Sequence, residues 1–205
     1  MARRLNPDGD RTLAIEVDVA DPGAVEAMVA ATVDRFGGLH LAVNNAGITG
    51  DHDVPLADTG IDAWRRILDI NLSGIFFGLK FQIPAMLAAG GGAIVNMSSG
   101  AGANGVRGIA PYCATKHGIV GLTRAAALDY ATQNIRINAI GPGYIETPLM
   151  LEAAQEVRDG FITKIPMHRM GTRREVADTV VFLLSDAASF LTGGFYLADG
   201  GQTAG

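Results

Sequence analysis

A tyrosine and a lysine four residues apart are the pair in this sequence best suited to moving a proton. In Tyr112-Cys-Ala-Thr-Lys116 the two side chains would lie one above the other on one face of a helix. A phenol with a pKa of about 10 is a poor base at neutral pH, but a neighbouring ammonium stabilises its phenolate. The spacing therefore predicts a tyrosine that donates and accepts a proton; the alternative is a simple pair on a helix surface.

Two further polar residues fit this chemistry. Ser99 precedes Tyr112 by thirteen residues and follows a predicted strand, where its hydroxyl would hold the oxygen on which the tyrosine acts. The alternative is an ordinary turn serine. Asn71 lies inside a long predicted helix, although asparagine is a mediocre helix former. Its presence in the apolar stretch DINLSGIFFG predicts either a buried hydrogen bond or a functional water site.

Predicted strands and helices alternate along the chain and would position these residues. Several strands are continuous apolar runs, as expected when helices cover both faces of a parallel sheet. The pattern therefore predicts an α/β fold with a mostly parallel sheet, in one domain over residues 1–205 without repeats or linkers. The expected strands are Thr12–Val17, Leu39–Val43, Ala93–Met97, Ile135–Ile140 and Phe195–Ala198. The expected helices are Pro22–Phe36 with Asp21 as N-cap, Asp62–Ala88 with a bend or break at Pro84, Tyr112–Ala131, Leu149–Ile162 and Arg174–Leu184.

Composition excludes several classes of partner. The net charge is −5 and there is no basic run, which argues against nucleic acid and anionic membranes. Lys80, Asp129 and the glycines are expected to interrupt each apolar run before it reaches membrane-spanning length. The first ten residues contain no apolar stretch typical of a signal peptide, and Cys113 is the single cysteine. We expect a soluble, cytoplasmic protein, and no histidine spacing predicts a metal site.

Taken in order, these motifs resemble the short-chain dehydrogenase/reductase family from about Thr12 to Gly201. The resemblance is carried by Asp18-Val19, Asn44-Asn45-Ala46-Gly47, Asn71 in INLSG, Ser99 at the end of IVNMSS, Tyr112-x-x-x-Lys116, Pro142-Gly143-Tyr-Ile-Glu-Thr147 and Asp199-Gly200-Gly201. It implies a Rossmann-like, doubly wound sheet. It also implies NAD or NADP as cofactor and a reaction that interconverts a secondary alcohol and a ketone by hydride transfer.

The resemblance implies a role for each matching residue. Tyr112 would be the general acid/base, with Ser99 on the substrate oxygen. Lys116 would lower the pKa of Tyr112 and bind the nicotinamide ribose, while Asn71 would hold a water in a proton relay. Around the rest of the cofactor, Asp18 and Val19 would touch the adenine, Asn45, Ala46 and Gly47 would line the adenosine ribose, and Pro142, Gly143, Ile145 and Thr147 would hold the nicotinamide and its carboxamide.

The family's glycine-rich phosphate loop follows its first strand, ahead of the segment with which this sequence begins. The resemblance therefore implies an N-terminally truncated chain that lacks this loop and the first two strands, roughly 40–45 residues. Thr12–Val17 would then leave the sheet, pair with Leu39–Val43, or recruit another chain. The residue that separates NAD from NADP would be missing too, so that choice stays open.

One internal stretch has the glycine spacing of a phosphate-binding loop. Gly100-Ala-Gly102-Ala-Asn-Gly105 spells G-x-G-x-x-G, but no helix begins within it and the next strand ends without an acidic residue. We interpret it as a flexible loop on the substrate side, with phosphate binding as the alternative.

Two other hypotheses for the function of the chain compete with that of an active oxidoreductase. The first is a non-catalytic subunit or fragment that binds cofactor weakly or not at all. The second, which the motifs favour less, is a dehydratase or epimerase using the same tyrosine and lysine. IFFGLKFQI and GIVGLTRAAALDY are apolar on more than one face, which predicts a homo-oligomer, most simply a tetramer. The substrate is expected to be a small alcohol or ketone.

Overall fold

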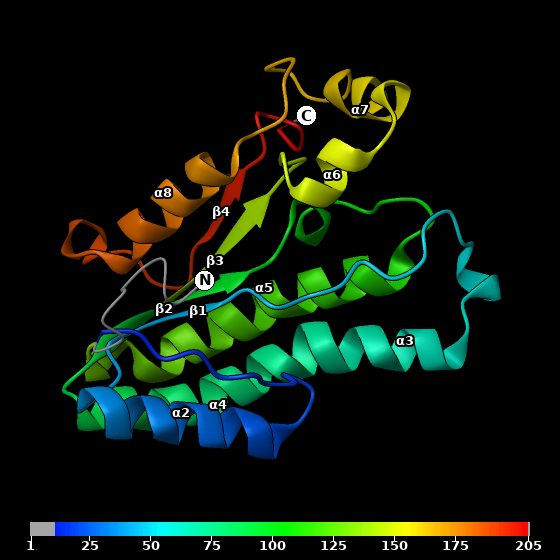
Figure 1. Ribbon diagram of the computed structural model, residues 1–205. Coiled ribbons are helices and arrows are strands. Elements are labelled where there is room, and N and C mark those ends of the chain that lie inside the picture. Colours follow the sequence, from blue (N-terminus) through cyan, green and yellow to red (C-terminus); the bar gives the residue numbers. More distant parts are fainter. Residues whose placement is uncertain (1–10, 205) are drawn as a thin grey trace.

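The computed structural model describes residues 11–204, and its centre is a parallel sheet of four strands in the order β1-β2-β3-β4. Each strand pairs with the next one along the chain, so a helical crossover joins every pair (Figure 1). The first ten residues, where no signal peptide was expected, lie outside the described range. The strands are β1 (Leu41–Asn44), β2 (Gly92–Met97), β3 (Ile135–Pro142) and β4 (Phe195–Ala198); the α-helices are α2 (Pro22–Phe36), α3 (Ile61–Leu68), α4 (Gly74–Ala88), α5 (Ala110–Tyr130), α6 (Pro148–Glu152), α7 (Gln155–Ile162) and α8 (Arg173–Leu184).

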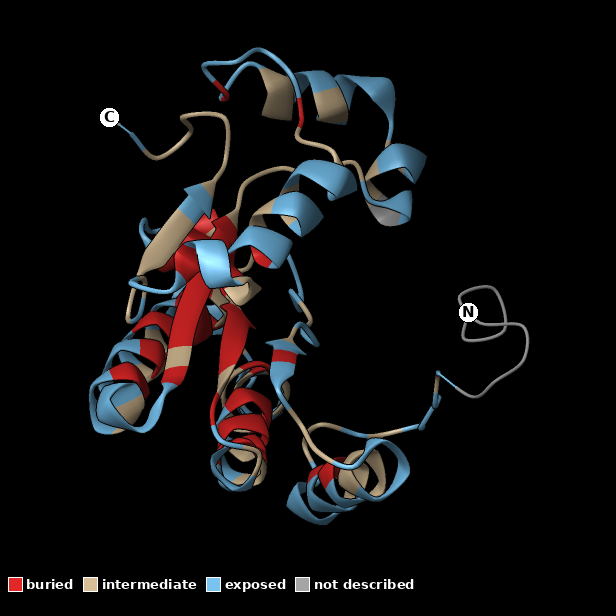
Figure 2. Ribbon diagram, turned by 90° about the vertical axis from the view of Figure 1, so that its left-hand side faces the viewer, coloured by how far each residue is buried: buried red, intermediate tan, exposed pale blue. Residues whose placement is uncertain are grey.

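Helices cover both faces of the sheet, as the continuous apolar strands predicted. Helices α4 and α5 pack on one face with α2 beside α4, and α8 lies on the other (Figures 1 and 2). Successive strand residues point to opposite faces, so Ile94 joins the core beneath α4 and α5 while Val95 joins the core beneath α8. Both side chains are almost completely buried. The prediction of a Rossmann-like α/β fold is confirmed.

Helix α2 has the predicted ends. The Asp21 carboxylate accepts hydrogen bonds from the backbone N–H groups of Gly23 at 2.8 Å and Ala24 at 3.3 Å. Two backbone donors that the helix cannot satisfy itself are thereby paired, which is the reason an aspartate is favoured at this position. The helix runs from Pro22 to Phe36.

The long helix around Asn71 is interrupted at a different place from the one predicted. Helix α4 continues through Pro84 to Ala88, because Ile83 and Met86 on either side are buried in the core and hold the helix against the sheet. The irregularity is instead a π-helical turn, η2 (Asp69–Ser73), between α3 and α4. The predicted helix Leu149–Ile162 likewise divides into α6 and α7, since Ala153 and Ala154 are extended.

By length and mean hydropathy, the stretch Ile61–Ala88 is compatible with a membrane span, contrary to the expectation that each apolar run is too short. This is weak evidence, because a core helix gives the same signal. Here Ile75, Leu79 and Ile83 of this stretch belong to the core beneath the sheet. Packing within the domain therefore accounts for its apolar composition.

The predicted strand Thr12–Val17 is wrong: this segment has no strand structure and passes beside α2, outside the sheet (Figure 1). Of the three outcomes considered for it, leaving the sheet is the one found. A strand needs a neighbour for its backbone groups, and within residues 11–204 no strand pairs with this segment or with the outer edge of β1. Leu41 and Val43 of β1 are consequently 54% and 44% exposed.

Candidate active site

The carboxyl ends of β1, β2 and β3 lie at the same edge of the sheet, because the three strands are parallel. The segment Asn45–Gly47 follows β1, Ser99 follows β2, and Gly143–Thr147 follows β3. Helix α5 begins at Ala110, so its first turn brings Tyr112 to this edge as well. In open α/β sheets, ligands bind in the crevice outside the carboxyl ends of the strands.

Tyr112 and Lys116 lie one helical turn apart, as their spacing predicted. The Lys116 Nζ atom is 5.3 Å from the centre of the Tyr112 ring. Burial raises the pKa of the Tyr112 phenol, and a hydrogen bond with the Ser99 hydroxyl offsets part of this increase. The net shift is upward, opposite to the lowering expected from Lys116. A phenol with a raised pKa keeps its proton at neutral pH and is therefore suited to donate it.

Lys116 is a buried cation with only 4% of its surface exposed. Its Nζ atom donates a hydrogen bond to the backbone carbonyl of Met97, at the end of β2, over 2.9 Å. Burial disfavours the charged form and lowers the pKa of Lys116 to about 8. The ammonium is thus held beside Tyr112 by the strand that leads to Ser99.

Asn71 is fully buried in the π-helical turn, and its amide is paired with the loop that follows β1. Its Oδ1 atom accepts from the Ile48 N–H and its Nδ2 atom donates to the Ile48 carbonyl, both over 2.8 Å. Nδ2 also lies 3.3 Å from the Thr115 hydroxyl on α5. Of the two roles open to a mid-helix asparagine, the structure shows the buried hydrogen bond, which fixes the loop after Asn45–Gly47.

The turn that contains Asp18 and Val19 packs against the beginning of α4 through Val19. The Asp18 carboxylate accepts from the Ala20 N–H over 3.0 Å, which forms a tight turn before α2. A Cβ atom added to Gly74 would lie 3.1 Å from the Val19 carbonyl oxygen, so the turn packs closely on α4 three residues after Asn71. The structure thereby brings the Asp18-Val19 pair to the same end of the sheet as the other predicted residues.

The segment after β3 is held by the last strand and by the loop before α8. The Gly143 N–H donates to the Ala198 carbonyl over 3.1 Å, and Ile145 forms a β-bridge with Gly171. The Thr147 hydroxyl accepts from the Met150 N–H and caps α6. These contacts fix the backbone of the segment expected to hold the nicotinamide.

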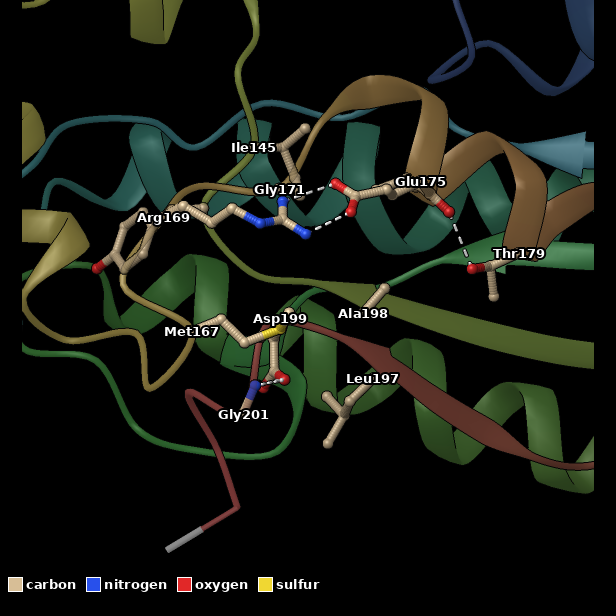
Figure 3. Close-up of a pocket in the computed structure, with 13 residues that line it drawn as sticks. Ile145, Met167, Arg169, Gly171, Glu175, Thr179, Leu197, Ala198, Asp199 and Gly201 are labelled. Carbon is tan, nitrogen blue, oxygen red and sulfur yellow. Dashed lines mark hydrogen bonds and ion pairs between the residues drawn. The ribbon is translucent and has the colours of Figure 1, made fainter.

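A cavity of about 460 Å³ lies between this segment, α8 and the end of β4, and it does not contain the candidate catalytic residues. Ile145 and Val176 form part of its wall, and Arg169 and Glu175 form an ion pair across it at 2.6 Å (Figure 3). Sequence reasoning missed this pair. The motif Thr172-x-x-Glu175 carried a signal, because Glu175 and Thr172 form a capping box at the start of α8.

The glycine-rich stretch Gly100–Gly105 is only partly the open loop that was expected. Gly100–Gly102 forms a buried 3₁₀ turn against α5, whereas Ala103, Asn104 and Gly105 are exposed. A Cβ atom at Gly102 would lie 2.4 Å from the Ser98 hydroxyl and 2.9 Å from the Lys116 carbonyl oxygen, so the close approach requires glycine. Within residues 11–204 no group of three or more His, Cys, Asp or Glu side chains is placed to hold a metal.

Comparison with known proteins gives a family match over nearly the whole chain. Residues 1–203 match the family model described as enoyl-(acyl carrier protein) reductase. The chain is 47% identical over 196 residues to cyclohexanol dehydrogenase of Acinetobacter sp. (strain SE19), covering 95% of this chain and 76% of that protein. It is 42% identical over 204 residues to cis-4-hydroxycyclohexanecarboxylate dehydrogenase of Sinomonas cyclohexanicum, covering 100% of this chain and 82% of the relative.

Two solved structures are equally similar in shape. The crystal structure of levodione reductase superposes with a TM-score of 0.92 at 39% identity, covering 98% of this chain and 81% of that one. The structure of ElxO with NADP bound also has a TM-score of 0.92, at 31% identity, covering 99% of this chain and 83% of that one.

Proposed function

Because the chain belongs to the short-chain dehydrogenase/reductase family and is an NAD(P)-dependent oxidoreductase that interconverts a secondary alcohol and a ketone, we propose that Tyr112 exchanges the proton in this reaction. The observation that carries the proposal is the cluster at one sheet edge, in which Tyr112 lies beside the Ser99 hydroxyl and the Lys116 ammonium. In reduction, the Tyr112 phenol donates its proton to the substrate carbonyl oxygen. In oxidation, the phenolate accepts the hydroxyl proton of the alcohol.

The neighbouring residues prepare this transfer. Ser99 holds the substrate oxygen within reach of Tyr112, and the Lys116 charge stabilises the phenolate once it forms. Asn71 acts through the loop after β1, which it holds by the two bonds to Ile48. A water linked to Lys116 would extend the proton path to solvent.

The residues at the sheet edge fit a dinucleotide. Asn45, Ala46 and Gly47 are exposed there directly after β1, which leaves their backbone accessible to a ribose. When bound, the nicotinamide supplies or accepts the hydride. The residues that would hold the cofactor are Asp18 and Val19 at the adenine, Asn45–Gly47 at the adenosine ribose, Lys116 with Tyr112 at the nicotinamide ribose, and Pro142, Gly143, Ile145 and Thr147 at the nicotinamide.

We expect a cyclic secondary alcohol as substrate. The similarity to cyclohexanol and 4-hydroxycyclohexanecarboxylate dehydrogenases supports this choice. Steady-state assays with NAD and NADP should give a higher kcat/KM for cyclohexanol than for 1-hexanol, an acyclic primary alcohol of the same carbon number. Equal values for the two alcohols, or a preference for 1-hexanol, would refute the substrate proposal and leave the family assignment untouched.

The active form is proposed to be a homo-oligomer, most simply a tetramer. Large apolar side chains are exposed on α8 and the loop after it, where Val181 is 64% and Phe190 is 100% exposed, and on α4 and α5, where Phe76 is 47% and Leu128 is 83% exposed. A subunit interface would remove this apolar area from water. Light scattering at micromolar concentration should give the mass of a tetramer; a monomer mass would contradict the proposal.

We further propose a cytoplasmic location. The single cysteine, Cys113, is buried and has a free thiol, which is compatible with a reducing compartment.

A further inference from the structure

Ser98, the neighbour of Ser99, is a buried hydroxyl that the proposed reaction does not use. Only 3% of its surface is exposed. Its Oγ atom donates a hydrogen bond to the backbone carbonyl of Lys116 over 2.9 Å. A carbonyl oxygen has two lone pairs, so this one can accept from Ser98 without losing a bond within α5.

Lys116 is therefore tied twice to the end of β2. Its side chain donates to the carbonyl of Met97, and its own carbonyl accepts from Ser98. The contact is tight, because Gly102 leaves no room for a Cβ atom between Ser98 and the Lys116 carbonyl. The last residue of β2, Met97, and the residue after it, Ser98, are thus fixed to the helical turn that carries Lys116, and Ser99 is the next residue in the chain.

We propose that Ser98 is a positioning residue that sets the distance between Ser99 and Tyr112. Tyr112 lies one turn before Lys116 on α5, whereas Ser99 lies on the loop that leaves β2. The Ser98 hydroxyl joins these two elements one helical turn from Tyr112. The loop that begins at Ser99 has further polar contacts with α5, through the Ser99 and Tyr112 hydroxyls and, later in the loop, through Val106 and the Cys113 thiol, but the Ser98 contact immediately precedes Ser99 in the chain. The proposal rests on the proposed function of Tyr112 and Ser99.

The pKa of Tyr112 reports this distance without any cofactor. The groups that face the phenol are the Ser99 hydroxyl, whose hydrogen bond lowers its pKa, the Cys113 thiol, which raises it, and the Lys116 ammonium near its ring. In Ser98→Ala the Ser99 hydroxyl should move away from the phenol, so the pKa of Tyr112 should rise further, because the hydrogen bond that lowers it is weakened. Nuclear magnetic resonance of the full chain labelled with ¹³Cζ-tyrosine measures this value, and Tyr112→Phe identifies the resonance.

Thr123→Val is the matched control. Thr123 is also a buried hydroxyl at the interface of β2 and α5, where it accepts from Asn96 over 3.0 Å, but it lies two turns from Lys116. This variant should lose a similar amount of thermal stability and leave the pKa of Tyr112 unchanged. Ser98→Cys keeps a hydrogen-bond donor at this position, although the thiol is a weaker donor and slightly larger than the hydroxyl, so it should move the pKa in the same direction by less.

The proposal also predicts a several-fold lower kcat for Ser98→Ala with little change in KM, because the displaced Ser99 hydroxyl no longer aligns the substrate oxygen with Tyr112 while the other substrate contacts remain. An unchanged Tyr112 pKa in both Ser98 variants, or an equal rise in Thr123→Val, would overturn the positioning role. Failure of the proposed function would appear differently, as near-normal turnover in Tyr112→Phe.

Discussion

Tyr112→Phe is expected to lower kcat by at least about 100-fold while the protein keeps its fold. Phenylalanine retains the ring but has no proton to exchange, and general acid/base catalysis contributes about 10²–10⁴-fold to such reactions. Cofactor binding should stay nearly intact, because the phenol makes only one of the contacts that would hold a dinucleotide. Steady-state kinetics of cyclohexanol oxidation and cyclohexanone reduction provide the measurement, with circular dichroism to confirm the fold.

Tyr130→Phe is the matched control, because Tyr130 ends the same helix and packs against the core away from the sheet edge. It loses one phenol hydroxyl just as the Tyr112 variant does, and its kcat should remain near normal. Similar losses in both variants would mean that the hydroxyl acts through the stability of α5, which would contradict the acid/base role of Tyr112.

Lys116→Met should lower the rate of catalysis without lowering the stability of the fold. Removal of the ammonium takes away the charge that stabilises the Tyr112 phenolate, so kcat for alcohol oxidation should fall by roughly 100-fold. Methionine fills a similar volume without a charge to desolvate, and replacing buried charges with apolar side chains is often neutral or stabilising. At about pH 7 the free energy of unfolding should therefore be no lower than that of the unmodified chain.

The pH dependence of this stability difference has a definite sign. Burial lowers the pKa of Lys116 from 10.5 to about 8 in the folded protein. The cost of burying its charge is complete below pH 8 and disappears as the pH rises towards 10.5, where the unfolded chain also loses the proton. As the pH rises from about 8 to 10.5, the free energy of unfolding of the unmodified protein should therefore increase relative to that of Lys116→Met. Denaturant unfolding of both proteins at several pH values tests this, and a constant difference would contradict the burial of a charged Lys116.

Local signals allowed much of the fold to be predicted from the sequence. Helix α2 has the predicted bounds because Asp21 and the helical spacing of its apolar residues act within the segment itself. Strand β4 likewise coincides with the predicted run Phe195–Ala198. Thr12–Val17 shows the limit of such reasoning, because β-propensity says nothing about whether a neighbouring strand exists. Pro84 is a second case, since core packing on either side of it outweighs its tendency to break a helix.

The candidate site was also predictable where local spacing decides it, but not where contacts between distant residues do. The spacing of Tyr112 and Lys116 depends on helix periodicity alone, and the structure places the pair as expected. The contacts of Lys116 with Met97 and Ser98 join residues that lie 19 and 18 positions apart, which no local pattern encodes. The upward pKa shift of Tyr112 was unpredictable for the same reason, because burial is a property of the assembled fold.

Deuterium transfer tests the central claim most directly. Cyclohexanol deuterated at the carbinol carbon is incubated with the protein and oxidised NAD or NADP, and the reduced cofactor is analysed by nuclear magnetic resonance. A hydride transfer assisted by Tyr112 predicts one deuterium at C4 of the reduced nicotinamide ring, and a rate of deuterium transfer at least about 100-fold lower in Tyr112→Phe. Cyclohexanone formed without deuterium in the reduced cofactor, or undiminished transfer in Tyr112→Phe, would contradict it.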